Sequence, residues 1–200
     1  MIDTARIDAI VVGGSAGAFT VLSSLLPALG PAPRVPVLVV LHLPPDRPSA
    51  AAAALGGRGQ RVKEAEDKER IEAGVIYFAP PGYHLLVEPD RSLALAFDEP
   101  VHHSRPSIDV LFESAADAFG EGLLGVILSG ANEDGAAGLG AISARGGLTV
   151  VQRPDTAEHP FMPAAALRAA PASAALSVDE LRSIFAGFDT PSRDRGALDD

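Results

Sequence analysis

The stretch that decides the fold is Ile7-Asp8-Ala9-Ile10-Val11-Val12-Gly13-Gly14-Ser15-Ala16-Gly17-Ala18-Phe19. Its first half is a short apolar run rich in β-branched residues and ended by glycine, which predicts a buried strand over residues 7–12. Gly13, Ser15 and Gly17 then fit the pattern G-x-S-x-G, in which a serine occupies a tight turn between a strand and a helix. Glycine allows such a turn and lets a substrate approach the backbone closely. Ser15 is therefore the candidate nucleophile, and the rest of the chain must supply a base and an acid.

Further apolar segments follow this turn in alternation with helical patterns. The strand-like runs are continuously apolar, which indicates burial on both faces and hence a parallel sheet with helices on either side. The alternation predicts an α/β fold with a doubly wound, mostly parallel sheet. The expected strands cover residues 35–41, 123–128 and 148–152, and the expected helices cover residues 18–29, 49–55, 107–119, 136–144, 163–169 and 178–185.

Two segments depart from this alternation. The short runs 75–79, 84–88 and 93–97 are separated by proline-containing turns, so we expect a meander or hairpin that forms an antiparallel insertion. The mixed-charge run over residues 61–72 is interpreted as a solvated surface segment.

Length and composition narrow the class of protein. A chain of 200 residues with 47% apolar residues suits one domain, expected over residues 1–188 with a disordered tail at 189–200. The net charge of −10 argues against nucleic-acid binding. No run reaches the ~20 apolar residues that span a bilayer, and there is no signal peptide, so we expect a cytoplasmic protein without membrane insertion. The absence of cysteine excludes disulfides and thiol catalysis, and no metal-binding motif or cofactor is expected.

Three residues suited to hydrolysis follow the predicted parallel strands. Ser15 follows the first strand, His42 ends the second, and Asp134 lies in the loop after residues 123–128. The carboxyl ends of parallel strands share one edge, where ligands bind. A serine hydroxyl needs an imidazole to take its proton, and the imidazole needs a carboxylate to orient it. The order Ser, His, Asp differs from the Ser, Asp, His of α/β-hydrolases, so the pattern around Ser15 does not indicate that superfamily.

Each of these residues has a simpler interpretation. Ser15 fits a glycine-rich phosphate loop, His42 a hydrogen-bonded core or surface histidine, and Asp134 a helix N-cap. A dinucleotide site is the main alternative, but Ser15 stands where G-x-G-x-x-G needs its second glycine, and His42 stands where the ribose-binding acid is expected.

Six segments in order give the chain a resemblance to the catalytic domain of the bacterial chemotaxis protein-glutamate methylesterases, the CheB family. The resemblance covers residues 7–188. The segments are Val-Val-Gly-Gly-Ser-Ala-Gly-Ala around Ser15, Val-Val-Leu-His-Leu-Pro around His42, Gly-Val-Ile-Tyr-Phe-Ala-Pro-Pro-Gly-Tyr-His-Leu (74–85), Ser-Arg-Pro-Ser-Ile-Asp-Val-Leu-Phe (104–112), Gly-Val-Ile-Leu-Ser-Gly-Ala-Asn-Glu-Asp-Gly-Ala (125–136) and Phe-Met-Pro (161–163).

The resemblance implies a three-layer αβα sandwich and a Ser15–His42–Asp134 triad without a cofactor. It implies a glutamate methyl ester as substrate, carried by the cytoplasmic helices of a methylated chemoreceptor or a similar signalling protein, with glutamine deamidation in some members. Backbone groups near Ala16 and in the loop Ala131-Asn132, with Met162 nearby, would form the oxyanion site and substrate wall.

The chain departs from the family pattern at the presumed oxyanion site. The family usually follows its serine with threonine and two glycines, whereas this chain has Ala16-Gly17-Ala18, and Gly130-Ala131-Asn132 replaces Gly-Met-Gly. These changes keep a second interpretation open, a degenerate, non-catalytic module that binds a helical partner. Family members usually carry an N-terminal receiver domain. Because the first strand starts at Ile7, we expect this chain to be unregulated, to be regulated by a partner, or to act on something other than chemotaxis receptors.

Overall fold

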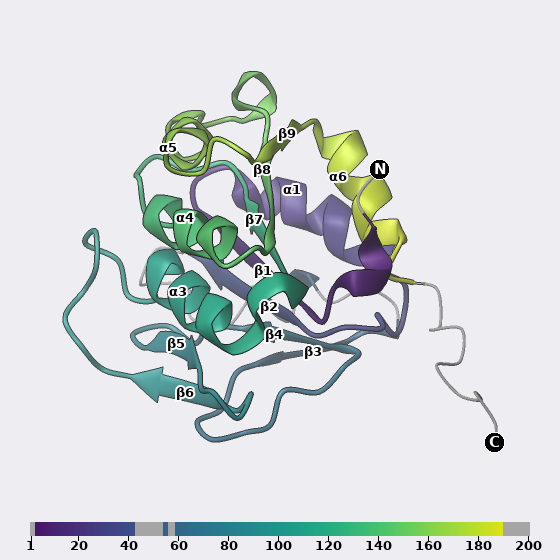
Figure 1. Cartoon of the computed structure of the whole chain (residues 1–200), viewed down its shortest axis with the longest axis vertical. Helices are drawn as coiled ribbons and strands as arrows, with labels where there is room; N and C mark the ends of the chain where they lie inside the picture. Colours follow the sequence, from purple (N-terminus) through teal and green to yellow (C-terminus); the bar gives the residue numbers. More distant parts are fainter. Residues whose placement is uncertain (1–2, 43–53, 56–58, 190–200) are drawn as a thin grey trace.

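A seven-stranded parallel sheet forms the centre of the molecule in the computed structural model, which describes residues 3–42, 54–55 and 59–189 (Figure 1). All residues of β1, β2 and β7 are buried, as their continuous apolar sequences predict. A separate two-stranded antiparallel sheet is formed by β5 and β6. The strands are β1 Ala9–Gly14, β2 Val37–Leu41, β3 Arg61–Glu64, β4 Val75–Phe78, β5 His84–Val87, β6 Leu93–Ala96, β7 Leu123–Ile127, β8 Leu148–Gln152 and β9 Ala174–Leu176.

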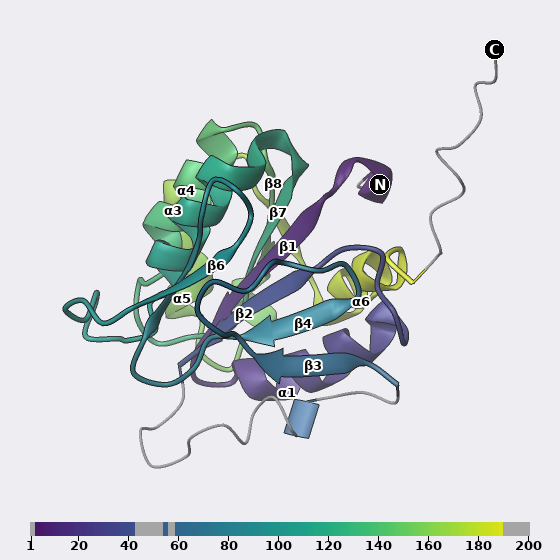
Figure 2. The same cartoon turned by 90° about the horizontal axis from the view of Figure 1, so that it is seen from below.

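Helices cover both faces of the parallel sheet, which confirms the predicted αβα sandwich. On one face, α1 and α6 pack through Leu22, Leu25, Leu181 and Phe185; on the other lie α3, α4 and α5 (Figures 1 and 2). The helices are α1 Ala18–Leu25, α3 Ile108–Phe119, α4 Ala136–Ala144, α5 Phe161–Ala169 and α6 Val178–Ala186, with 3-10 helices at Thr4–Arg6, Leu26–Leu29, Gly120–Gly122 and Pro154–Thr156.

The strand order β3-β4-β2-β1-β7-β8-β9 places β1 where the chain reverses its direction of winding. In open parallel sheets, ligands bind beyond the strand ends at this switch point. The register brings Gly14 opposite Leu41 and Gly13 opposite Ile127. The residues that follow β1, β2 and β7 therefore lie at one level of the same edge.

The structure differs from the sequence analysis at three strands. The run 75–79 is not part of a meander, because β4 pairs in parallel with β2 and β3, and the proline turn after it leads the chain out of the main sheet. The charged run 61–72 contains the edge strand β3, whose outer side remains solvated as expected for an edge. The short edge strand β9 was not predicted at all.

Two predicted segments lie mostly or wholly outside the described residues, and one predicted helix ends earlier than expected. The predicted helix 49–55 lies mostly outside them, and so does the tail beyond Asp189. The helix expected over residues 18–29 ends at Leu25 and continues as a 3-10 turn to Leu29. No helix in the part of the chain that the structure describes is long and apolar enough to cross a membrane.

The packing of α3 against α4 depends on a glycine. Gly138 of α4 faces α3, where an added Cβ would lie 2.5 Å from the Cβ of Phe112 and 3.1 Å from backbone atoms of Asp109. Backbone and Cβ atoms cannot give way as the end of a flexible side chain can. This glycine therefore sets the distance between α3 and α4.

We expect Gly138→Ala to destabilise the protein by about 1–3 kcal/mol, because the new methyl group forces the two helices apart. The matched control is Gly140→Ala in the same helix, where a Cβ meets its nearest atom, the Ala169 carbonyl oxygen, at 3.4 Å. That variant should be neutral or more stable by up to ~1 kcal/mol, since alanine is the better helix former. Urea unfolding measures both values, and equal effects would contradict this account of the packing.

Candidate functional site

The turn after β1 presents Ser15 at the carboxyl edge of the sheet. Its N–H donates to the Ser129 carbonyl at 2.9 Å, and the His42 N–H donates to the Gly14 carbonyl at 3.0 Å. Gly17, at φ 80°, is the N-cap of α1, and a side chain there would be strained and would meet Ser129 Oγ and Glu158 Cβ at 2.7 Å. The half-buried Ser15 is thus fixed by its backbone between the ends of β2 and β7.

Hydrogen bonds of Ser129 stabilise the turn that bears Ser15. Its fully buried hydroxyl donates to the Ala16 carbonyl at 2.7 Å and accepts from the His159 N–H at 2.9 Å. Its own N–H donates to the Gln152 side chain at 2.9 Å. The sequence analysis did not identify Ser129 or Gln152, because neither belongs to a catalytic pattern and their contacts span long sequence separations.

His42 and Asp134 form a direct pair. The Nε2 atom of His42 lies 2.9 Å from Oδ2 of Asp134, although 92 residues separate them. The Asp134 side chain is fully buried and the His42 side chain is 12% exposed. An ionised carboxylate only accepts hydrogen bonds, so Nε2 carries the proton and Nδ1 has the free lone pair. Ser104 Oγ faces this Nδ1 atom at 3.4 Å.

The start of α3 surrounds Asp134 with donors. Its carboxylate accepts from Ser107 Oγ at 2.8 Å, from the Ile108 N–H at 2.8 Å and from the Asp109 N–H at 3.0 Å. Burial alone would raise the pKa of Asp134, but the hydrogen bonds from His42 and the start of α3 lower it below its ordinary value. Asp134 therefore remains charged and can orient an imidazole.

A second serine, Ser107, contacts Asp134, and a second histidine, His84, contacts Ser107; their hydrogen bonds indicate another role. Ser107 donates its hydroxyl proton to Asp134, while the Ser107 N–H donates to His84 Nδ1 at 3.1 Å. The other ring nitrogen of His84 lies 3.1 Å from the Glu99 carbonyl, so backbone groups occupy both nitrogens. Ser107 has no exposed surface and His84 only 1%. This network is consistent with a triad that shares Asp134, but it offers no imidazole nitrogen to the Ser107 hydroxyl, so we assign it to the support of Asp134.

The site contains a second buried carboxylate besides that of Asp134, namely that of Asp109. Asp109 accepts from the Gly138 N–H at 2.7 Å, and His102 Nε2 lies 3.4 Å from its other oxygen. Burial raises the pKa of Asp109 to about 6; the Gly138 hydrogen bond opposes this rise, and the charge of Asp134 adds to it. Among the described residues, no group of three or more histidine or acidic side chains is arranged to bind a metal ion.

The remaining predicted site residues lie around this turn in different environments. Ala16 and Ala131 are exposed, and Asn132 is half-buried with its side-chain oxygen accepting from the Asp134 N–H at 3.3 Å. Met162 is buried under Gly130 and bonds to it through the backbone at 2.9 Å. Within the described residues, Ser15 Oγ makes no hydrogen bond. The structure thus joins His42 to Asp134 and brings Ser15 to the same edge, while Ser104 is a neighbour that the sequence analysis missed.

A parallel α/β sheet with a serine turn and a histidine–carboxylate pair at its switch point defines a hydrolase-type site. The sequence profile described as CheB methylesterase matches residues 10–184. The chain therefore belongs to the CheB methylesterase family, as the sequence analysis predicted, and the carboxylic ester hydrolase class expected from the sequence is that of this family.

Individual relatives agree with this assignment. A Leptospira interrogans protein, assigned provisionally as a protein-glutamate methylesterase/protein-glutamine glutaminase, is 42% identical over 183 residues, which cover 91% of this chain and 95% of the relative. An Archaeoglobus fulgidus protein-glutamate methylesterase/protein-glutamine glutaminase is 38% identical over 79% of this chain and 46% of its own length. The crystal structure of the Thermotoga maritima CheB methylesterase catalytic domain superposes with a TM-score of 0.84 at 26% identity, covering 90% of this chain and 98% of that one.

The raised pKa of Asp109 leads to a prediction about how stability depends on pH. Between its unfolded pKa near 3.8 and its folded pKa of about 6, Asp109 binds more protons in the native state than in the unfolded state. Its contribution to the free energy of unfolding therefore falls as pH rises through this window. Asp109→Asn removes that contribution, so the stability of the wild type relative to the variant should fall by on the order of 2 kcal/mol between pH 4 and pH 7.

Urea unfolding of both proteins across this range measures the difference. Asp117→Asn, at an exposed position of the same helix, controls for the loss of a negative charge. Parallel stability curves for wild type and Asp109→Asn would show that Asp109 does not titrate in this window.

Proposed function

We propose that this protein hydrolyses the γ-methyl ester of glutamate residues in a methylated chemoreceptor or a similar signalling protein. Ser15 is the nucleophile, His42 the base and Asp134 the residue that orients His42. The observation that supports the proposal is the 2.9 Å His42–Asp134 pair, together with the backbone bond from the His42 N–H to the carbonyl of Gly14, the residue before Ser15. The names of the relatives supply the substrate class, since they describe protein-glutamate methylesterases.

The protonation of His42 sets the course of the reaction. Since Nε2–H is bonded to Asp134, Nδ1 is the atom that takes the Ser15 proton as Oγ attacks the ester carbonyl carbon. The same proton then passes to the methoxy oxygen, and methanol leaves as the glutamyl–Ser15 ester remains. Water next gives a proton to Nδ1 and attacks that ester. The acyl–Oγ bond then breaks, Nδ1 returns the proton to Oγ, and the glutamate carboxylate leaves, which restores Ser15 and His42.

The negative charge on the tetrahedral intermediate needs donors near Ser15. In the part of the chain that the structure describes, the N–H groups of Ala16, Gly17, Ala131 and Asn132 donate no hydrogen bond. The proposal assigns the oxyanion to donors from this group, and one such donor is typically worth about 2.7–4 kcal/mol. The departures from the family pattern change side chains here and leave these N–H groups in place.

The same chemistry extends to the amide of glutamine, with ammonia as the leaving group in place of methanol. The relatives' names include protein-glutamine glutaminase. Release of ammonia from an unmethylated receptor fragment that carries glutamine at the modification sites tests this extension separately from ester hydrolysis.

We expect Ser15→Ala to reduce methanol release from a methylated receptor fragment by at least about 10³-fold, because no nucleophile remains. Ser23→Ala is the matched control, since this exposed serine of α1 bonds only to the Thr20 carbonyl. Gas chromatography of methanol measures the rates, and circular dichroism verifies that both variants fold. Activity in Ser15→Ala close to that of the control would refute the assignment of the nucleophile.

Labelling by a fluorophosphonate, followed by peptide mapping, separates this proposal from its competitors. The label should attach to Ser15, and a label on Ser104 or Ser107 would transfer the nucleophile's role to that residue. The free Ser15 hydroxyl and the Ala131-Asn132 loop favour one further candidate, a non-catalytic module that binds a helical partner. Such a module should neither be labelled nor release methanol.

A further inference from the structure

We propose that four exposed aromatic side chains around the site form a docking surface for the protein segment that carries the ester. The aromatic rim consists of Phe19, Tyr83, Phe97 and Phe161, and this inference rests on the proposed function. Among the described residues, the exposed large apolar side chains are these four, at 40%, 43%, 69% and 52% exposure, and Leu148 at 37%. Scattered exposed apolar residues are normal, but concentration around one site marks an interaction surface.

Phe19 and Phe161 flank the Ser15 turn. Phe19 lies in the first turn of α1, one residue after Ala18, whose N–H donates to the Ser15 carbonyl at 3.0 Å. Phe161 begins α5 and precedes Met162, whose N–H donates to the Gly130 carbonyl at 2.9 Å. The hydroxyl of Ser129, which precedes Gly130, holds the Ala16 carbonyl at 2.7 Å. Hydrogen bonds of neighbouring residues thus hold the segments that carry both aromatic residues next to the turn that bears Ser15.

Tyr83 and Phe97 stand on the side of His42. Their ring centroids are 5.7 Å apart, and the Arg105 guanidinium carbon lies 3.9 Å from the Phe97 centroid. Arg105 also donates to the Asp98 carbonyl at 2.8 Å, and it directly follows Ser104, which faces His42 Nδ1. Phe97 thus stacks against a guanidinium while most of its ring stays exposed and available to a partner.

The reaction itself identifies the occupant of this surface. A glutamyl side chain has only two methylenes, so its ester reaches Ser15 only if the substrate backbone lies against the residues around the turn. Phe19 and Phe161 flank that turn, and tyrosine and arginine, which also occur at the rim, are among the side chains that dominate protein interfaces. Glu133 and Glu158 are exposed in the same region, and the chain carries a net charge of −10. The surface therefore suits neutral, apolar side chains on both sides of an uncharged ester rather than an acidic segment.

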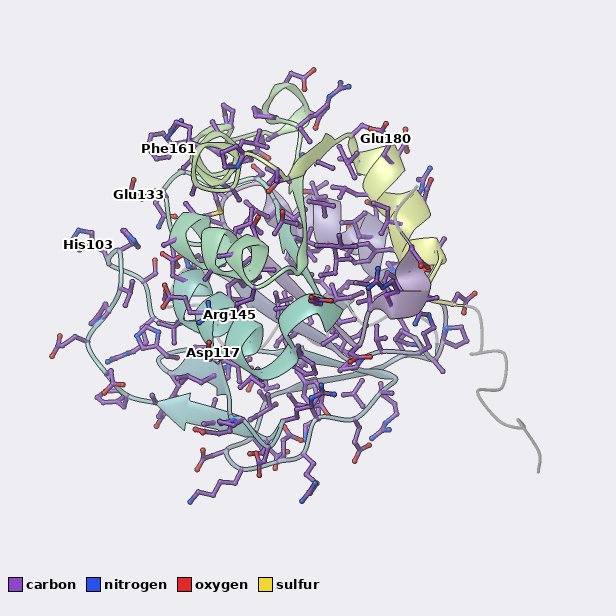
Figure 3. All side chains as sticks on the ribbon, viewed as in Figure 1. His103, Asp117, Glu133, Arg145, Phe161 and Glu180 are labelled. Carbon is purple, nitrogen blue, oxygen red and sulfur yellow. The ribbon has the colours of Figure 1, made fainter. Side chains whose placement is uncertain are left out.

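Figure 3 labels one residue of the aromatic rim, Phe161. Phe161, Glu133 and His103 appear on one side of the molecule in that view, and the carboxyl ends of β3 and β4 point to one side in Figure 2, where α5 and the loop after β6 also lie. Leu148 begins β8, so it belongs to the opposite, amino-terminal edge of the parallel sheet.

Leu148 is therefore the matched control for Phe97 and Phe161. We expect Phe97→Ala and Phe161→Ala each to raise the KM for a methyl-esterified cytoplasmic fragment of a chemoreceptor about tenfold. Their kcat/KM for N-acetylglutamate γ-methyl ester amide should stay within about twofold of wild type, because this small ester does not reach the rim. Leu148→Ala should change neither value.

Binding without turnover keeps this inference separate from the proposed function. In the Ser15→Ala background, the methylated fragment should bind about tenfold more weakly when Phe97→Ala or Phe161→Ala is added, and equally well with Leu148→Ala, as titration calorimetry can measure. Absence of fragment binding, an equal effect of Leu148→Ala, or an equal loss on the small ester would overturn the docking surface. If neither ester is hydrolysed by the wild type while the rim variants still weaken binding, the docking surface stands and the proposed function fails.

Discussion

The buried charge of Asp134 is the constraint on which the arrangement of the site depends. Removing a carboxylate from water costs several kcal/mol unless donors replace the lost hydration. Here the donors are the first N–H groups of α3, the Ser107 hydroxyl that precedes them and the His42 ring, so they come from two separate segments that meet the loop of Asp134. Each segment must be in place before the charge is stabilised, so the loop after β7, the start of α3 and the end of β2 are fixed together. The positive end of the α3 dipole acts in the same direction. The residue proposed to orient His42 thereby also fixes the packing of the elements around it.

The neighbouring Asp109 shows how the same helix start treats two carboxylates differently. Asp134 accepts from several donors and keeps a lowered pKa, whereas Asp109 accepts from one N–H and has a pKa of about 6. Two adjacent buried charges would repel each other, and the unequal supply of donors decides which group stays ionised. The negative charge is thus concentrated on the carboxylate that contacts His42. The Gly138 N–H that binds Asp109 comes from the tightest point of the α3–α4 contact, so the helix packing and this charge distribution depend on the same glycine.

The sequence identified those parts of the structure that leave a local pattern. Continuous apolar runs predicted β1, β2 and β7, and their ends located Ser15, His42 and Asp134 at one edge of the sheet. The charged edge strand β3 was missed because its side chains are half in water, and β4 was misassigned because a proline turn follows it. Ser104 and Ser129 were missed for another reason. Their contacts join residues 62 and 113 positions apart, and nothing in the local sequence around a serine shows which distant carbonyl or imidazole it meets.

The tautomer of His42 connects the chemistry to the surface on which a substrate must lie. Because Asp134 holds Nε2–H, Nδ1 is the ring nitrogen that can accept a proton, and this edge of the ring faces the segment that carries Ser104 and Arg105. The side chain of Arg105 stacks on Phe97, so the loop that approaches the basic atom also orders the most exposed aromatic ring described in the chain. The proposed docking surface and the proposed base are thus connected through the consecutive residues Ser104 and Arg105, and the buried carboxylate fixes which edge of the His42 ring faces them.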